Sequence, residues 1–141
     1  MIVLFLVGIL PFGIGWLVNG WIQGGFTELP VIAASFLVLW AVVGLIGKLF
    51  VKNTLSVVVA LNFIAFLDLI FVAVQQFVIG RFLEGIPGLL SQFFFLPSLN
   101  FGAAIAGWIP VTQTVFGACL GSFVLMIASS AIGAALTKTK D

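Results

Sequence analysis

The sequence has little charge and lacks residue types that commonly carry enzyme chemistry. It has no histidine, no tyrosine and one cysteine, Cys119, and its five basic and four acidic residues make up 6% of the chain. Without histidine, the usual zinc sites, axial haem ligands and the commonest general base are absent. One thiol forms no disulfide within the chain and is too few for an iron–sulfur cluster. We therefore expect no metal site and no cofactor.

Two further classes of function are disfavoured by what is missing. A net charge of +1 provides no basic patch that would neutralise a run of phosphates, so we expect no nucleic-acid partner. The sequence contains no Walker loop, no dinucleotide-binding glycine motif and no nucleophile elbow. The acidic residues, Glu28, Asp68, Glu84 and Asp141, are scattered along the chain. We expect that the protein is not an enzyme.

What the sequence has in abundance is apolar side chains. Hydrophobic residues make up 63% of the chain, whereas a soluble domain is roughly half apolar and about a quarter charged. So few charges cannot cover the surface of a soluble domain, and disorder requires low hydrophobicity. We expect an integral, multi-pass membrane protein, in a bacterial cytoplasmic membrane or an equivalent one, with membrane lipid as its main surroundings.

Four apolar runs are long enough to cross the membrane as helices. A hydrocarbon core of about 30 Å requires about 20 helical residues at 1.5 Å each. The runs cover residues 2–21, 30–47, 54–79 and 112–136. The sequence therefore predicts an all-α fold, a four-transmembrane-helix bundle that forms one transmembrane domain over residues 1–141.

The segment 82–110, between the third and fourth runs, is apolar but interrupted. Pro87, Pro97 and Pro110 divide it, together with several glycines, and no stretch of about 18 residues is left intact. One interpretation is an interfacial segment that lies among the lipid headgroups, with Trp108 at the boundary. The other is a re-entrant segment, which is tolerated only where protein or water covers its backbone. The sequence leaves both open.

The lysines predict the orientation of the bundle. Cytoplasmic loops carry an excess of Lys and Arg. If the N-terminus is cytoplasmic, so are the loop after the second helix and the C-terminus, and Lys48, Lys52, Lys138 and Lys140 all lie inside. Arg81 then lies outside. We expect both termini to be cytoplasmic.

Small residues mark two faces where helices are expected to pack. Gly8 and Gly15 share a face of the first helix, and Gly117 and Gly121 are four residues apart in the last. In lipid, small residues let helix backbones approach closely. These faces serve either packing within the bundle or a homo-oligomeric interface. The sixteen Phe and four Trp, including Trp40, are expected to be membrane anchors and packing material.

Asp68 is the one ionisable residue well inside a predicted span. A charge there costs about 2.5–3.5 kcal/mol on insertion scales, so it marks a function or a specific partner. It lies about 24 Å along the helix from Lys52, at 1.5 Å per residue. Asn19, Ser35 and Ser122 fall near the same level of the other three helices. A deeper polar layer holds Asn62 and Ser129.

Two hypotheses explain this arrangement. Gln75 shares the helix stripe of Asp68, so the functional hypothesis is a polar cavity of Asp68, Asn19, Ser35, Ser122 and Gln75 that binds an ion, a proton or a substrate headgroup. The structural hypothesis is that Asp68 bonds to Asn19 or Ser122, or pairs with a cation of a partner subunit.

The function predicted first is that of a non-catalytic subunit or accessory component of a membrane complex. The alternative is a small oligomeric transporter, channel or lipid-handling protein that uses Asp68 and the polar layer. Both require a partner, either further copies of this chain as a homo-oligomer or other membrane subunits as a hetero-complex. No family signature in the sequence is specific enough to decide between them.

Overall fold

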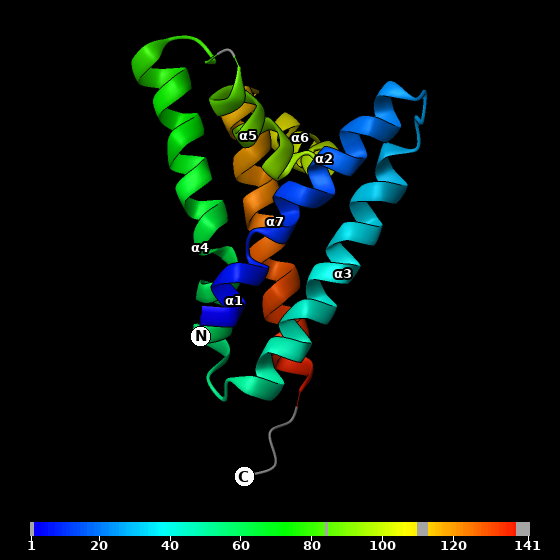
Figure 1. The fold of residues 1–141 in the computed structure, drawn as a ribbon, viewed down its shortest axis with the longest axis vertical. Helices are drawn as coiled ribbons and strands as arrows, with labels where there is room; N and C mark the ends of the chain where they lie inside the picture. The colour runs from blue at the N-terminus through cyan, green and yellow to red at the C-terminus, as the bar shows by residue number, and fades with distance from the viewer. Residues whose placement is uncertain (1, 84, 110–112, 138–141) are drawn as a thin grey trace.

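The computed structural model describes residues 2–83, 85–109 and 113–137, and within these residues it is helical and has no strand. The chain forms eight elements in this part, which follow one another as shown in Figure 1. They are α1 (Ile2–Val7), α2 (Leu10–Gln23), α3 (Leu29–Phe50), α4 (Thr54–Ala73), the π-helical η1 (Val74–Ile79), α5 (Ile86–Phe95), α6 (Leu99–Gly107) and α7 (Val115–Leu136).

The prediction of four helices of membrane-spanning length and composition is confirmed. Among the described residues, four helices are long and apolar enough to cross a membrane: Ile2–Gln23, Leu29–Phe50, Thr54–Ile79 and Val115–Leu136. The third matches its predicted bounds, and the others differ by up to three residues at their ends. Position 112, where the fourth helix was expected to begin, lies outside the described residues, as do Glu84, Lys138 and Lys140.

The first span is one continuous run in the sequence but is broken in the structure. α1 ends at Val7, a turn follows at Gly8 and Ile9, and α2 begins at Leu10. Pro11 explains the break, because it has no N–H to donate to the Val7 carbonyl and its ring clashes with the carbonyl of that preceding turn. The chain continues through three-residue hydrogen bonds, Ile9 N–H to Leu6 O at 3.1 Å and Phe12 N–H to Ile9 O at 3.0 Å.

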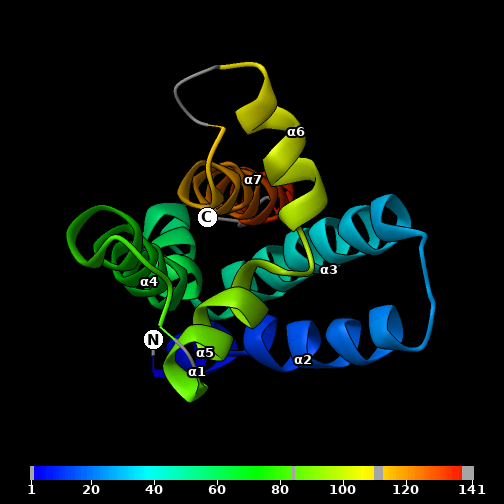
Figure 2. The same cartoon turned by 90° about the horizontal axis from the view of Figure 1, so that it is seen from above.

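α7 is the central packing partner of the bundle. It packs along α3, α4 and α6, whereas α1 packs on α4 and α2 packs on α5. α2 and α3 lean away from α4, and α5 and α6 lie in the space that this divergence leaves (Figure 1). Viewed from above, α5 lies over the junction of α1 and α2, and α6 lies beside α7 (Figure 2). The short helices therefore connect the diverging long helices: α5 packs on α2 and α4, and α6 packs on α7 and α3.

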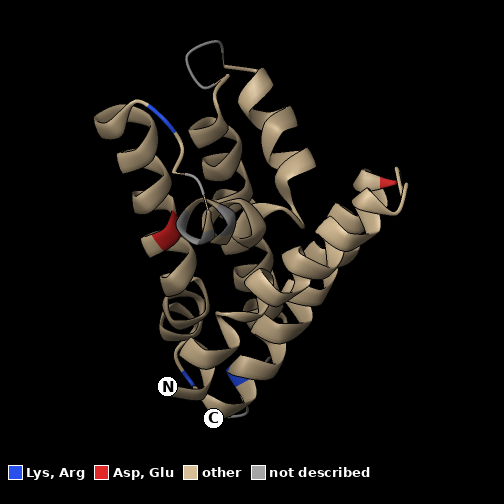
Figure 3. Cartoon of the chain, turned by 45° about the horizontal axis from the view of Figure 1, so that its top comes forward, with Lys and Arg blue, Asp and Glu red and all other residues tan. Residues whose placement is uncertain are grey.

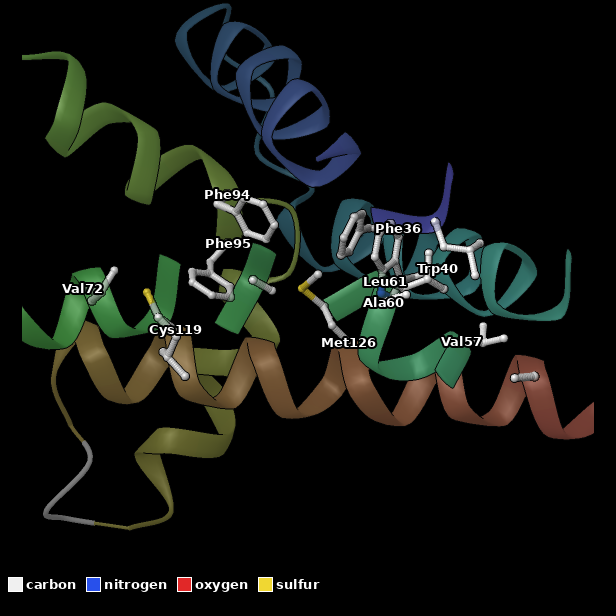
Figure 4. Packing of buried hydrophobic residues seen from close by; sticks show 14 residues of the cluster. Phe36, Trp40, Val57, Ala60, Leu61, Val72, Phe94, Phe95, Cys119 and Met126 are labelled. Carbon is white, nitrogen blue, oxygen red and sulfur yellow. The ribbon is translucent and has the colours of Figure 1, made fainter. Parts of the chain in front are cut away.

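The buried core runs through the middle of this arrangement and joins α3, α4, α5 and α7. Trp40, Leu61, Phe95 and Met126 are fully buried in it (Figure 4). The rings of Phe36 and Trp40 stack with their centroids 5.8 Å apart. Large apolar side chains also cover the outside of the molecule, as Phe50 and Trp108 do at 80% and 82% exposure. Such a surface is suited to lipid rather than water.

The interrupted segment forms two short helices, α5 and α6, joined by a buried turn. Pro97 and Ser98 in this turn are fully buried, and the Ser98 N–H bonds to the Phe95 carbonyl at 3.0 Å. α6 packs closely on α7 because Gly102 has no side chain. A Cβ atom at this position would overlap Ala118 and Ser122 of α7. The backbone of the turn is therefore covered by protein rather than exposed on the surface.

The charged residues of the described chain gather near the ends of the bundle, apart from Asp68. Lys48 lies in the last turn of α3 and Lys52 just after it, at the end where α1 begins. Arg81 follows η1 and Glu28 precedes α3, at the opposite end (Figure 3). The lysines and Arg81 are thus segregated as the sequence predicted for this part of the chain.

Candidate functional site

Asp68 lies on α4, well inside the third span. It is the acidic residue of that helix in Figure 3, about 21 Å from the helix start at 1.5 Å per residue. Its side chain is half-buried, between the fully buried Ala65 and the buried Leu69. Since insertion of an acidic group at this depth is costly, its position requires a compensating interaction.

Asp68 forms part of the wall of an apolar pocket. The pocket has a volume of about 450 Å³ and lies between α4, α5 and the junction of α1 and α2. Asp68 is the only charged residue among those that line it, and the other lining residues are all apolar: Ile9, Phe12, Ile64, Leu67, Phe71, Leu90 and Phe94. A volume of this size falls within the range of small-molecule sites, which is about 300–1,000 Å³.

One oxygen of the Asp68 carboxyl group is not satisfied by the described part of the chain. Its Oδ2 atom is buried and has no hydrogen-bond partner among the described residues. A buried polar atom without a partner costs about 1–3 kcal/mol, and more when it is charged. Asp68 therefore carries one unsatisfied oxygen in otherwise apolar surroundings.

The break in the first span is next to this pocket. Ile9, in the turn between α1 and α2, and Phe12, one turn further, both line it. Discontinuous transmembrane helices with an irregular backbone are found where they line a cavity that is covered by protein. The helix break and the intramembrane carboxyl group thus meet at one place, although they come from different spans.

Gln75 was predicted to share the cavity with Asp68, but the structure places it elsewhere. It is fully buried in η1, where its Nε2 donates to the Ser91 Oγ at 3.1 Å. Its Oε1 accepts the Leu83 N–H at 2.8 Å. The neighbouring Gln76 accepts the Phe116 N–H at 2.9 Å, at the start of α7. The two glutamines therefore attach η1 to α5 and α7.

The other three residues of the predicted polar layer also lie away from the pocket. Asn19 is half-buried on α2, and Ser35 is exposed on α3. Ser122 is fully buried between α7 and α6, against Gly102, and its Oγ has no hydrogen-bond partner among the described residues. Depth along a helix places residues at one level, but it does not make them face one another. Of the five predicted residues, Asp68 alone lines the pocket.

A polar cluster that the sequence analysis did not assemble lies deeper in the bundle. Asn62 on α4 accepts a hydrogen bond from the Trp40 Nε1 at 3.2 Å and donates to the Ser130 Oγ at 2.9 Å and the Val58 carbonyl at 2.8 Å. The cluster joins α3, α4 and α7. The sequence signal was the deeper layer with Asn62 and Ser129, but Ser129 bonds instead to the Leu37 carbonyl.

Three of the four predicted packing glycines, Gly8, Gly15 and Gly121, lie at close backbone contacts between helices of the same chain. A Cβ at Gly8 would lie 2.9 Å from the Leu61 carbonyl oxygen of α4, and one at Gly15 would overlap the Phe93 backbone of α5. Gly121 faces Gly102 of α6, and Gly117 is buried in the first turns of α7. The packing within the bundle thus makes use of these positions.

The described part of the chain offers no evident metal site, because no three acidic or cysteine side chains lie together in it. Cys119 is free and buried on α7. The chain matches no family model, and no curated protein or solved structure is significantly similar to it. The fold and composition define the class: a helical, multi-pass membrane protein with four helices suited to span a bilayer, as counted over the described residues.

Proposed function

We propose that the protein is a small membrane transport protein in which Asp68 binds a cation, a proton or the headgroup of a lipid-like substrate. The observation that carries the proposal is that Asp68 lines an apolar pocket of about 450 Å³ and that its buried Oδ2 has no hydrogen-bond partner among the described residues. An ionised carboxylate in apolar surroundings is costly, and a bound proton or cation relieves that cost. A carrier requires a site that binds and releases a positive ligand, and the Asp68 carboxylate is suited to that role.

The architecture around the pocket supports this function. One wall is the broken first span, and another is α5, which is joined to α6 by the turn with the buried Pro97 and Ser98. We propose that α5 and α6 form a re-entrant segment rather than an interfacial one, because protein covers the backbone of their turn. Irregular segments of this kind at membrane depth are typical of transporter sites.

A four-helix chain encloses little space, so we propose that the working unit is a homo-oligomer. We also propose the orientation that the lysines indicate, with both termini cytoplasmic and the Asp68 pocket nearer the outer surface, in a bacterial cytoplasmic membrane or an equivalent one. Membrane lipid is then the immediate neighbour of the pocket rim, where Leu67 and Leu90 are 47% and 43% exposed.

The proposal is tested by flux measurements on the purified protein in liposomes. Wild-type protein is expected to carry protons or cations, and Asp68→Asn is expected to abolish the flux, because the neutral amide neither takes up a proton nor balances a positive charge. Asp68→Glu keeps the charge and is expected to retain part of the flux. Glu28→Gln, which removes an exposed acidic group outside the spans, is the matched control. Equal flux from wild type and Asp68→Asn would refute the proposal.

A second candidate function is that of a non-catalytic accessory subunit. It is favoured by the same exposed rim, because a partner helix that lies against Leu67 and Leu90 would be able to present a Lys or Arg to the Asp68 carboxyl group. In that case a defined membrane protein co-purifies from native membranes in fixed proportion, and Asp68→Asn loses it. Native mass spectrometry distinguishes this hetero-complex from the homo-oligomer.

A further inference from the structure

Taking the proposed function as its basis, we infer that the substrate of the Asp68 pocket is a hydrophobic organic cation with a single positive charge that enters from the lipid. The inference names the chemical class of ligand, which the proposed function leaves open. It rests on the composition of the pocket wall, on the position of the one carboxyl group and on the exposure of the rim.

The charge of the ligand follows from the charge of the pocket. Asp68 is the one charged residue in the lining, and its buried Oδ2 lacks a partner among the described residues. One carboxylate balances one positive charge. A ligand with two positive charges, or a zwitterion, would leave a charge uncompensated in apolar surroundings, at considerable cost.

The apolar lining selects against hydrated and strongly polar ligands. Ca²⁺ takes six to eight oxygen ligands and Mg²⁺ demands six, whereas this pocket supplies the oxygens of one carboxyl group. A sugar or an amino acid would lose several hydrogen bonds to water with no replacement from the wall. An organic cation with shielded charge needs neither a set of oxygen ligands nor additional hydrogen-bond partners.

Aromatic side chains are the second feature that favours an organic cation. Phe12, Phe71 and Phe94 line the same pocket as Asp68, from α2, α4 and α5. Aromatic rings attract cations through their negative faces and provide a large apolar contact surface. The combination of one carboxylate and several aromatic rings matches a cationic centre that carries apolar groups.

The route into the pocket follows from which of its residues are exposed. Ile9, Leu67 and Leu90 line the pocket and are each between 43% and 47% exposed on the apolar outer surface. That surface lies within the span of α4, so its surroundings are hydrocarbon rather than water. A hydrophobic cation concentrates in the bilayer, and it therefore reaches Asp68 from the side rather than along an aqueous path.

The test is direct binding of tetraphenylphosphonium to the full-length protein in lipid nanodiscs. We expect saturable binding that Asp68→Asn weakens at least tenfold and Asp68→Glu largely restores. The uncharged triphenylphosphine oxide should compete at least tenfold less well, and a hundredfold excess of Na⁺ should not compete. Each variant is first checked for an unchanged size-exclusion profile, so that loss of binding is not loss of folding.

A matched pair of variants on one helix tests the aromatic contribution. Phe71→Leu removes a ring that lines the pocket, whereas Phe66→Leu removes a ring of α4 that lies in a different pocket, with Asn62 and Phe123. We expect the first to weaken tetraphenylphosphonium binding severalfold and the second to leave it unchanged. Equal effects of the two would contradict a role for the aromatic lining.

The outcomes separate this inference from the function on which it rests. If Asp68→Asn binds tetraphenylphosphonium as tightly as the wild type, the substrate class is wrong. If liposomes show Asp68-dependent proton or Na⁺ flux without any binding of the organic cation, the transport function stands and the inference fails. If there is neither flux nor binding, both are wrong.

Discussion

Gly15 of α2 lies directly against the backbone of Phe93 in α5, so that no side chain fits between the two helices. This contact matters because α2 packs chiefly on α5 rather than on α3, the next long helix of the chain. α5 in turn lines the Asp68 pocket through Leu90 and Phe94. Gly15 is therefore one of the positions at which the first span approaches the helix that lines the pocket.

A side chain at Gly15 should separate the two helices. Gly15→Val places atoms into the Phe93 backbone, and overpacking of this kind costs about 1–3 kcal/mol. We expect a clear fall in the melting temperature of the detergent-solubilised protein. Gly13→Val is the control on the same helix, because a Cβ there meets nothing within 4 Å. If both variants melted at the same temperature, the close contact of α2 with α5 would be wrong.

The Trp40–Asn62–Ser130 cluster should act as one unit. Asn62→Leu leaves the buried Trp40 N–H without its acceptor, at a cost of about 1–3 kcal/mol, while the Ser130 hydroxyl keeps its bond to the Ile127 carbonyl. Trp40→Phe removes the indole donor but keeps an aromatic ring. We expect the double variant to lose less stability than the sum of the two single variants, because they break one shared bond. Thermal unfolding in detergent measures all three. Strict additivity would show that Trp40 and Asn62 are not coupled.

The position of α5 should depend on Gln75. Its amide joins Ser91 and the Leu83 N–H, so Gln75→Leu removes both bonds from a fully buried site. We expect faster hydrogen exchange in the peptide that covers residues 85–95, with α7 little affected. Gln23→Leu, at the exposed end of α2, serves as control. Unchanged exchange in α5 would mean that Gln75 does not hold it.

The orientation of the chain can be tested with engineered cysteines. In a Cys119→Ala background, Gln23→Cys places a thiol on the proposed outer end and Lys52→Cys places one on the proposed inner end, both at exposed positions. A membrane-impermeant maleimide should label the first in intact cells and the second only after permeabilisation. The opposite pattern would reverse the orientation that the lysines predict.

The sequence predicted the spans well because hydrophobic length is a local property. The third span was expected at residues 54–79, and α4 with η1 covers those residues. The break after Val7 was not predicted, although Pro11 was its visible cause, because composition alone does not reveal where a proline interrupts the hydrogen bonds of a long run. The π-helical turn that directs Gln75 toward α5 likewise gave no signal in the pattern.

The sequence by itself determined the class of the protein, the number of spans and the isolation of Asp68, because each of these depends on composition and on distance along a helix. Only the tertiary structure decided what surrounds Asp68. Residues at one depth face one another only if each helix is rotated about its axis so that these residues point inward. That rotation depends on contacts such as Gly15 with Phe93 and Gly102 with Gly121. Asp68 therefore lines an apolar, aromatic pocket rather than the predicted polar ring, and its Oδ2 has no hydrogen-bond partner among the described residues.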